Sequence, residues 1–267
     1  GRRPVRRGLG GVDRATHVAS RTRLQARRTL DELHAFDPRS ASWVALTPGG
    51  VPPLARQGHA ACAAGDALYV FGGWRLRACQ VGSLCTSVLN DLVRLSLRPQ
   101  LRWDVPRLGG VPPTPRHGHT LGLLPALGAQ QGGAPGGALL AFGGRGPRYN
   151  ASTHALHGTY LNDVHMLDLG AMAWSRVVME GAAPAPRAGH AAAVLADGLR
   201  VVLFGGEDAE GPLSDLHVLD VPRRVWWQAH ASGAYPRPRA GHAAVRVGGD
   251  VLFFGGAEED DEAARGA

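Results

Sequence analysis

The stretch RAGHAAAVLADGLRVVLFGGEDAE, residues 187–210, combines an arginine, a Gly-His pair, an apolar run and two adjacent glycines. Residues 201–204 are apolar and suit a buried strand. One glycine pair after a strand would mark only a turn. The same order of features recurs, however, in residues 56–73, 116–144 and 239–256. The chain is therefore an array of repeats, and the repeat decides the fold.

A second half of the repeat follows the glycine pair. An aspartate opens a short apolar segment at Asp91, Asp163 and Asp215, and a tryptophan follows each of these segments. Each tryptophan stands thirteen positions before the arginine of the next repeat. These tryptophans are Trp43, Trp103, Trp174 and Trp226, and the arginines are Arg56, Arg116, Arg187 and Arg239. Repeat length varies because insertions follow the glycine pair, at residues 74–88 and 145–159.

Each repeat offers four short apolar segments separated by turn residues, and none of them shows a sustained helical period. Four strands in a unit of about 50 residues are typical of a propeller blade, a small antiparallel sheet that must stack on its neighbours. The sequence therefore predicts an all-β protein.

The double glycine after a hydrophobic strand and the spaced tryptophan resemble the kelch repeat, over residues 30–256. The resemblance implies a kelch-type β-propeller of four-stranded antiparallel blades, with three full blades and two partial ones. Residues 30–37 match a third strand, with Glu32 at the aspartate position, and Gly256 ends a second strand. We expect a monomeric propeller segment within a longer chain, with closure into a four-bladed ring as the alternative.

The glycine pairs and the tryptophans are interpreted as structural. A glycine pair at a strand end lets the backbone approach the next blade and adopt angles closed to other residues. A large ring at a fixed position is expected to fill the wedge between neighbouring sheets.

Strands that alternate in direction bring the second-to-third-strand loop and the connection between blades to the same face. Functional residues concentrate in loops on a rigid scaffold, so this face is the predicted partner-binding surface. Aromatic and arginine side chains dominate interface hot spots. The candidates in the insertions are Trp74, Arg75, Arg77, Arg145, Arg148 and Tyr149, and the repeat arginines Arg56, Arg116, Arg187 and Arg239 join them. The alternatives are solvated loops for the insertions and, for the repeat arginines, bonds to carbonyls or a carboxylate that tie blades together.

Charge divides the chain unevenly. Residues 1–28 hold nine arginines and one aspartate, a net of +8, within a total of +7. We interpret residues 1–29 as the end of a blade strand plus an insertion loop, and residues 257–267 as an acidic loop or tail. An arginine-rich segment can bind nucleic acid, but this one lacks the interleaved aromatic residues that stack on bases. Nucleic-acid binding through this segment is thus an alternative function and not the main prediction.

The predicted function is a non-catalytic scaffold that binds a protein partner of unknown identity, without a cofactor or a catalytic residue. The kelch propeller also resembles the copper domain of galactose oxidase, so a metal-dependent oxidase is the rival prediction. That domain needs two tyrosines, two histidines and a cysteine, whereas the repeated histidines here are interpreted as scaffold and no metal ligands are predicted. No apolar segment is long enough to span a bilayer, and we expect an intracellular, cytoplasmic location.

Overall fold

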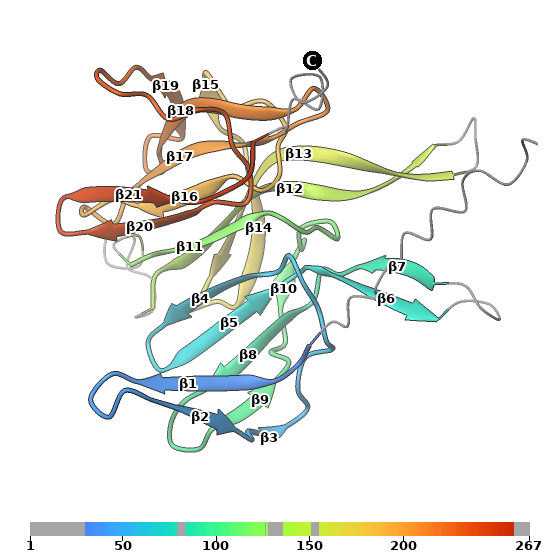
Figure 1. Cartoon of the computed structure of the whole chain (residues 1–267). Coiled ribbons are helices and arrows are strands. Elements are labelled where there is room, and N and C mark those ends of the chain that lie inside the picture. The colour runs from blue at the N-terminus through green and yellow to red at the C-terminus, as the bar shows by residue number, and fades with distance from the viewer. Residues whose placement is uncertain (1–29, 79–83, 126, 128–135, 151–154, 259–267) are drawn as a thin grey trace, which may run out of the picture.

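The computed structural model describes residues 30–258 except 79–83, 126, 128–135 and 151–154. Apart from one helical residue at Leu127, the elements in this part of the chain are β-strands, and the strands form a row of small sheets arranged as an arc (Figure 1). None of the described residues forms a helix long and apolar enough to cross a membrane. The predicted all-β fold of stacked blades is confirmed.

Three blades are complete, and each has four antiparallel strands that we letter A to D from the innermost strand outward. In sequence order, the first comprises β4 (Ala60–Ala64), β5 (Ala67–Phe71), β8 (Leu92–Ser96) and β9 (Arg102–Asp104). The second comprises β11 (Thr120–Leu124), β12 (Ala138–Asn150), β13 (Ala155–Asp168) and β14 (Ala173–Val177). The third comprises β16 (Ala191–Val194), β17 (Arg200–Glu207), β18 (Pro212–Asp220) and β19 (Val225–Ala229).

Two half-blades flank them. At the N-terminal side, β1 (Leu33–Asp37) and β2 (Ser42–Leu46) correspond to strands C and D of a blade. At the C-terminal side, β20 (Ala243–Val247) and β21 (Asp250–Phe254) correspond to strands A and B. Each pair forms its own two-stranded sheet. The predicted three full and two partial blades are therefore present.

A fifth short strand joins each complete blade at its outer edge. These strands are β3 (Gly49–Gly50), β10 (Gly109–Gly110) and β15 (Glu180–Gly181), and each runs parallel to strand D of the blade that follows it. These strands lie in the glycine- and proline-rich connection between one blade and the next. The second residue of each strand is a glycine with a positive φ, 71° at Gly110, where an added Cβ would lie 2.0 Å from the carbonyl oxygen of Trp174, so the close pairing with strand D requires glycine.

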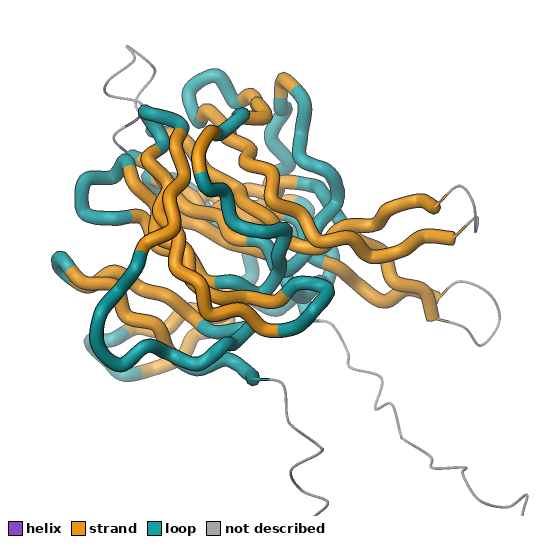
Figure 2. Tube along the Cα trace, turned by 90° about the horizontal axis from the view of Figure 1, so that it is seen from above, coloured by secondary structure: helices purple, strands orange, loops and turns teal. Residues whose placement is uncertain are grey.

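The described parts of the two insertions form hairpin arms. One arm consists of β6 (Trp74–Ala78) and β7 (Leu84–Val88). The other is the continuation of β12 and β13 beyond a register shift at Phe142/Gly144, where Arg145 pairs with Tyr160 and Asn150 with Ala155. Seen from above, both arms project from the same side of the molecule (Figure 2).

Aromatic rings fill the space between blades. Trp174 in strand D of the second complete blade packs on Phe71 in strand B of the first, with ring centroids 5.2 Å apart. Trp226 packs on Phe142 in the same way at the next junction, also at 5.2 Å. All four rings are buried, which confirms that these tryptophans fill the wedge between sheets.

The glycine pairs allow the close approach that the sequence predicts. Gly205 and Gly206 have φ values of 61° and 96°. A Cβ on Gly205 would lie 2.8 Å from the carbonyl oxygen of Arg239 in the following repeat. A Cβ on Gly206 would lie 2.7 Å from the carbonyl oxygen of Ala188 in its own repeat. Any other residue would strain the backbone and collide with backbone on both sides.

A ladder of backbone hydrogen bonds links the repeats near their innermost strands. The amide of Gly118 donates to the carbonyl oxygen of Gly58 at 2.8 Å, that of Gly189 to Gly118 at 2.8 Å, and that of Gly241 to Gly189 at 2.7 Å. These glycines belong to the Gly-His pairs of successive repeats. Each of the last three repeats therefore donates one such bond to the repeat before it.

Candidate functional site

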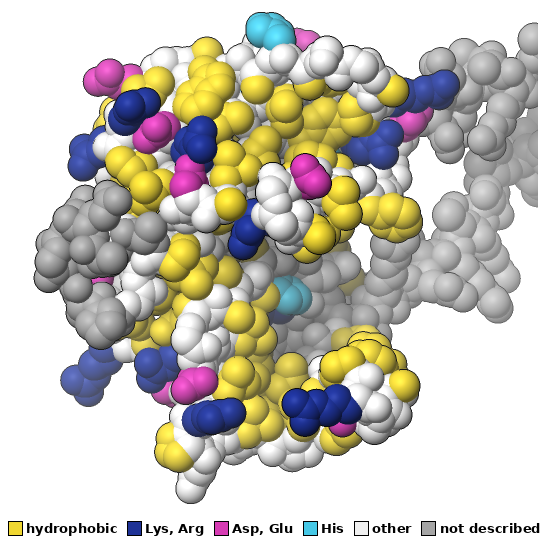
Figure 3. Space-filling model, turned by 90° about the vertical axis from the view of Figure 1, so that its left-hand side faces the viewer, with side chains coloured by type: hydrophobic (Ala, Val, Ile, Leu, Met, Phe, Trp, Pro, Cys, Tyr) yellow, Lys and Arg dark blue, Asp and Glu magenta, His cyan; other side chains and the backbone are white. Residues whose placement is uncertain are grey.

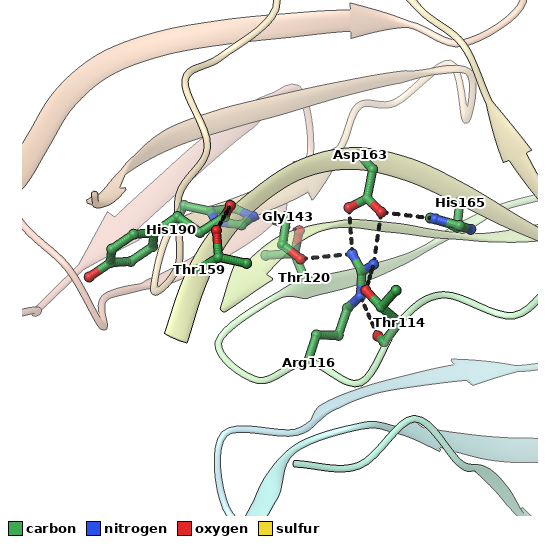
Figure 4. Close-up of polar contacts among 9 residues, drawn as sticks. Thr114, Arg116, Thr120, Gly143, Thr159, Asp163, His165 and His190 are labelled. Atoms are coloured by element: carbon green, nitrogen blue, oxygen red, sulfur yellow. Dashed lines mark hydrogen bonds and ion pairs between the residues drawn. The ribbon is translucent and has the colours of Figure 1, made fainter. Parts of the chain in front are cut away.

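The arginine of each complete blade lies at the centre of a clamp. Arg116 is fully buried, and its Nη1 donates to the carbonyl oxygen of Gly143 at 2.9 Å and to Asp163 Oδ1 at 2.7 Å. Its Nη2 reaches the other carboxylate oxygen at 2.9 Å, and its Nε donates to the carbonyl oxygen of Thr114 at 3.1 Å. Figure 4 shows Asp163 held between Arg116 and His165. The guanidinium fork is thus satisfied inside the blade.

The other two complete blades repeat the clamp. Arg56 pairs with Asp91, and Arg187 pairs with Asp215, each through both carboxylate oxygens. Both arginines are buried. This corrects the assignment of Arg56, Arg116 and Arg187 to a partner-binding surface, because buried and fully paired guanidinium groups cannot reach a partner. These three residues do bond carbonyl oxygens and a carboxylate, as the alternative predicts, but the bonds lie within one blade and do not tie neighbouring blades together.

Two of the clamps lower the pKa of their carboxylates. Burial opposes the charged form of Asp163, but hydrogen bonds from His165 and Arg116 outweigh it and hold the pKa of Asp163 well below its usual range. Asp215 follows the same pattern, with a pKa lowered by Arg187 and His217. An ionised carboxylate only accepts hydrogen bonds, so Nε2 of His165, 3.0 Å from Asp163 Oδ2, is the donor.

The histidine of the Gly-His pair packs between blades. His119 meets the ring of Phe71 edge-on, and His190 meets Phe142, each at 5.2 Å between centroids. Burial, with help from the charge of Arg187, lowers the pKa of His190 to about 3. These histidines are neutral scaffold residues at neutral pH, in agreement with their repetition in the sequence.

Two residues of every repeat meet at the face from which the arms project, here called the hairpin face. The residue after the repeat arginine forms an isolated antiparallel bridge with the residue after the glycine pair, as between His117 and Arg145. The equivalent bridges join Gln57 to Trp74, Ala188 to Glu207 and Ala240 to Ala257. The predicted sharing of one face by the blade connections and the insertions is therefore confirmed.

The bridged pairs have different compositions, and several of their side chains contact residues of the same blade or of the next one. Trp74 lies edge-on to His117, with centroids 6.3 Å apart. The guanidinium of Arg145 lies over the ring of Tyr160, 5.2 Å from its centroid. The hydroxyl of Tyr160 donates to Glu207 Oε1 of the next blade at 3.4 Å. Burial and the negative charge of Glu207 raise the pKa of Tyr160. All five side chains are half-buried.

The predicted candidates are distributed unequally on this face. Trp74, Arg75 and Arg145 are half-buried on the arms. Arg77, Arg148 and Tyr149 occupy strand positions in β6 and β12, but their side chains lie outside the described part of the structure. Arg239 is half-buried and donates to the carbonyl oxygens of Arg237 and Gly255. The arginine-rich segment 1–29 also lies outside the described residues.

Sequence reasoning missed His117, Tyr160 and Glu207. A signal was available for two of them, because they are non-repeated residues next to invariant landmarks: His117 follows the repeat arginine and Glu207 follows a glycine pair. Tyr160 has no such marker. It reaches the face only because the hairpin arm carries it opposite Arg145 in the β12–β13 register.

The described residues contain no group of three or more His, Cys, Asp or Glu side chains arranged to hold a metal ion. Cys62 is a free thiol in β4. Cys85 in β7 is disulfide-bonded, and Cys79, in the same insertion, lies outside the described residues.

Comparisons with known proteins agree with this architecture. The model of the KLHDC2/KLHL20/DRC7 Kelch-repeats domain matches residues 22–156 and 131–265. Acyl-CoA-binding domain-containing protein 4 of Arabidopsis thaliana is 34% identical over 84% of this chain and 30% of its own length. Human host cell factor 2 is 30% identical, over 78% of this chain and 27% of its own length. The phosphatase BSL2 of Arabidopsis thaliana is 32% identical, over 93% and 22%.

The chain thus spans less than a third of the length of these curated relatives. Among solved structures, the one titled "Structure of YjhT" superposes with a TM-score of 0.56 at 19% identity, covering 80% of this chain and 63% of the other. Its low identity supports the fold alone. Because the matched family model extends over nearly all of the repeats described above, the chain belongs to the kelch-repeat family.

Proposed function

We propose that the chain is a non-catalytic protein-interaction scaffold that binds its partner on the hairpin face. One observation carries the proposal. Residues that build the blades repeat from unit to unit, whereas no two units have the same bridged pair on the hairpin face, although alanine recurs at Ala188 and Ala240. A face whose side chains vary on a constant frame is suited to recognition rather than to holding the frame together.

The relatives support an interaction role for the kelch repeats, because these repeats occur in proteins whose names describe different activities. Their names describe an acyl-CoA-binding domain-containing protein and a serine/threonine-protein phosphatase, which are chemically different functions. Both share a segment similar to this chain, which covers less than a third of either protein. A module found beside such different functions is best explained as one that selects or positions partners.

The chemistry of the face suits a partner segment that carries both signs of charge. Arg145 has no carboxylate partner among the described ion pairs, and Glu207 has no cationic one. Tyr160 lies between these two charges. Trp74 offers a half-buried aromatic surface of the kind that dominates interface hot spots.

The test compares partners captured by the unchanged chain with those captured by a variant carrying Trp74→Ala, Arg75→Ala and Arg145→Ala. Its matched control changes the same residue types away from the hairpin face, as Trp227→Ala, Arg200→Ala and Arg223→Ala, all at exposed side chains. Quantitative mass spectrometry identifies a specific partner, and calorimetry with that purified partner measures its affinity. Thermal unfolding first establishes that both variants fold.

Loss of a hot-spot side chain costs about 2 kcal/mol or more in binding, so the hairpin-face variant should bind at least about 30-fold more weakly. The control should retain the affinity of the unchanged chain. Equal losses of affinity in both variants, or no loss in the hairpin-face variant, would contradict the proposal that the partner binds the hairpin face.

A further inference from the structure

Charged residues on the hairpin face are separated by sign from one blade to the next. The strands of the two arms, residues 74–78, 84–88, 145–150 and 155–160, contain four arginines and no aspartate or glutamate. The corresponding loop of the third complete blade is short, and its residues 207–211 contain three acidic residues and no arginine. The face therefore has a positive side over the first two complete blades and a negative side over the third.

The opposite face shows no such separation. Figure 3 views the molecule from the side away from the arms, and arginine and acidic side chains are intermingled there. At strand ends distant from the arms, Arg200 forms an ion pair with Asp197, three residues away in the chain. Neither Arg75 nor Arg145 has a carboxylate partner among the described ion pairs. Their charges therefore remain available to a ligand.

A continuous row of side chains joins the two sides of the hairpin face. Trp74 lies edge-on to His117, which forms a backbone bridge with Arg145. The guanidinium of Arg145 lies over the ring of Tyr160, whose hydroxyl donates to Glu207. Burial and the charge of Arg145 lower the pKa of His117, so this histidine is neutral at neutral pH. The row thus changes from cationic at Arg145 to anionic at Glu207.

The second arm holds the guanidinium of Arg145 in one place. Arg145 pairs with Tyr160, and Gly158 lies on the same side of β13 because it is two residues away. An added Cβ on Gly158 would lie 3.0 Å from Cζ of Arg145, so the guanidinium lies against this glycine as well as over the tyrosine ring. A guanidinium positioned in advance loses less side-chain entropy when it binds a carboxylate.

The acidic loop of the third blade is also held in a defined turn. The carboxylate of Asp208 accepts hydrogen bonds from the amides of Glu210 at 2.8 Å and Gly211 at 3.2 Å. Burial, together with the negative charges of Glu207 and Asp208, raises the pKa of Tyr160, so the field of the loop reaches the arm. A partner carboxylate over this loop would be repelled, whereas a partner cation would be attracted.

We propose that the hairpin face binds an extended protein segment in one orientation, with an acidic run across the two arms at Arg75 and Arg145 and a basic residue over residues 207–211. This inference rests on the proposed function and adds the class of partner segment and its direction. The reverse orientation would bring like charges together, which disfavours it. A nucleic acid is negative along its whole length, so part of it would lie against Glu207, whereas a protein segment can change sign.

The test uses the whole chain and a synthetic peptide with a run of glutamates and a run of lysines, held apart by a proline-rich spacer. Two versions carry a photo-crosslinking residue beside the glutamates or beside the lysines. Mass spectrometry maps the crosslinks at low salt, where attraction between exposed charges is screened least. The acidic end should crosslink to the two arms and the basic end to residues 207–211. Mapping separates these sites from the arginine-rich segment 1–28, which also attracts glutamates.

Three variants test the residues named in the proposal. Arg75→Gln with Arg145→Gln should reduce the crosslinks on the arms at least about fivefold, the loss expected for two exposed ion pairs. Gly158→Val keeps every charge but displaces the guanidinium of Arg145, so it should reduce the crosslinks on the second arm. Arg200→Gln with Arg223→Gln is the matched control and should leave all crosslinks unchanged. Thermal unfolding first establishes that each variant folds.

The proposal would be overturned by an acidic end that crosslinks equally to the arms and the acidic loop, or that does not crosslink to the arms. A single-stranded DNA oligonucleotide that crosslinks along both arms and the loop would assign the face to nucleic acid and overturn it as well. A captured partner that depends on Trp74 and Arg145, without a preference of the acidic end for the arms, would leave the proposed function standing and refute only the orientation. If no captured partner depends on these residues, the proposed function itself fails.

Discussion

Trp226 and Trp43 occupy the same position of the repeat, thirteen residues before an arginine, yet their environments are opposite. Trp226 lies against Phe142 of the preceding blade, and Trp43 has no preceding blade beside it in the described chain. Phe142 and Phe254 differ in the same direction. The repeat thus specifies the residue, whereas its neighbour determines whether that residue is buried. The contacts between neighbouring blades therefore contribute strongly to the free energy of unfolding.

The strongest way to break this comparison is to remove the tryptophans one at a time. Trp174→Ala should lower the free energy of unfolding by about 3 to 5 kcal/mol, because it empties a buried site against Phe71. Trp43→Ala should change it by less than about 1 kcal/mol in the single copy. Urea unfolding measured at low protein concentration checks both values. Equal losses would mean that the half-blade is packed in solution.

Glycine substitutions sharpen the comparison for the backbone. Gly205→Val should destabilise the chain by about 3 kcal/mol, because it combines a positive φ with a collision at the carbonyl oxygen of Arg239. Gly255→Val has a similar φ, 78°, but an added Cβ would meet nothing within 4 Å. Its cost should therefore be smaller and limited to backbone strain. The difference between the two melting temperatures measures the contribution of the next blade.

Protonation of a buried histidine should change the free energy of unfolding by less than the tryptophan and glycine substitutions do. Burial lowers the pKa of His190 to about 3, against about 6.5 in an unfolded chain. Between these values the unfolded state binds more protons, so stability is complete above pH 6.5 and falls as the pH decreases towards 3. The loss should be about 2 kcal/mol at pH 5.

His190→Gln should remove that part of the pH dependence when urea unfolding is compared at pH 7 and pH 5. Asp163 and Asp215 contribute little between pH 5 and pH 7, because their lowered pKa values keep them ionised in the folded state and the ordinary aspartate pKa of about 3.9 keeps them ionised in the unfolded state. His59→Gln, at the exposed equivalent position, serves as the control and should have a smaller effect. An unchanged pH dependence in His190→Gln would show that the imidazole is not the group that titrates.

Much of the fold could be predicted because the array supplies four aligned examples. The strands could be predicted from the Gly-Gly pair that follows each apolar run. The residues between the blades could be predicted from the constant spacing between tryptophan and arginine. The shared face followed from strand alternation, and the bridges of Gln57 with Trp74 and His117 with Arg145 bear it out.

The role of the arginines could not be decided in the same way. Arg116 and Arg187 are charged residues beside turn segments, which normally lie in solvent, and only the convergence of Asp163 and Asp215 from strand C buries them. Those partners stand 47 and 28 residues away. The strand structure of the arms could not be predicted either. The residue types in the insertions suggested a binding surface, but they did not indicate that Arg145 pairs with Tyr160 across two strands.

The ladder from Gly58 through Gly118 and Gly189 to Gly241 uses the same donor and the same acceptor at every step. The backbone bonding at each junction is therefore the same, and duplication or deletion of one unit would preserve this ladder. Gene duplication can thus lengthen such an array one blade at a time. Differences in sequence between units then occur in the arms and in the bridged residues beside them, which take no part in the glycine ladder.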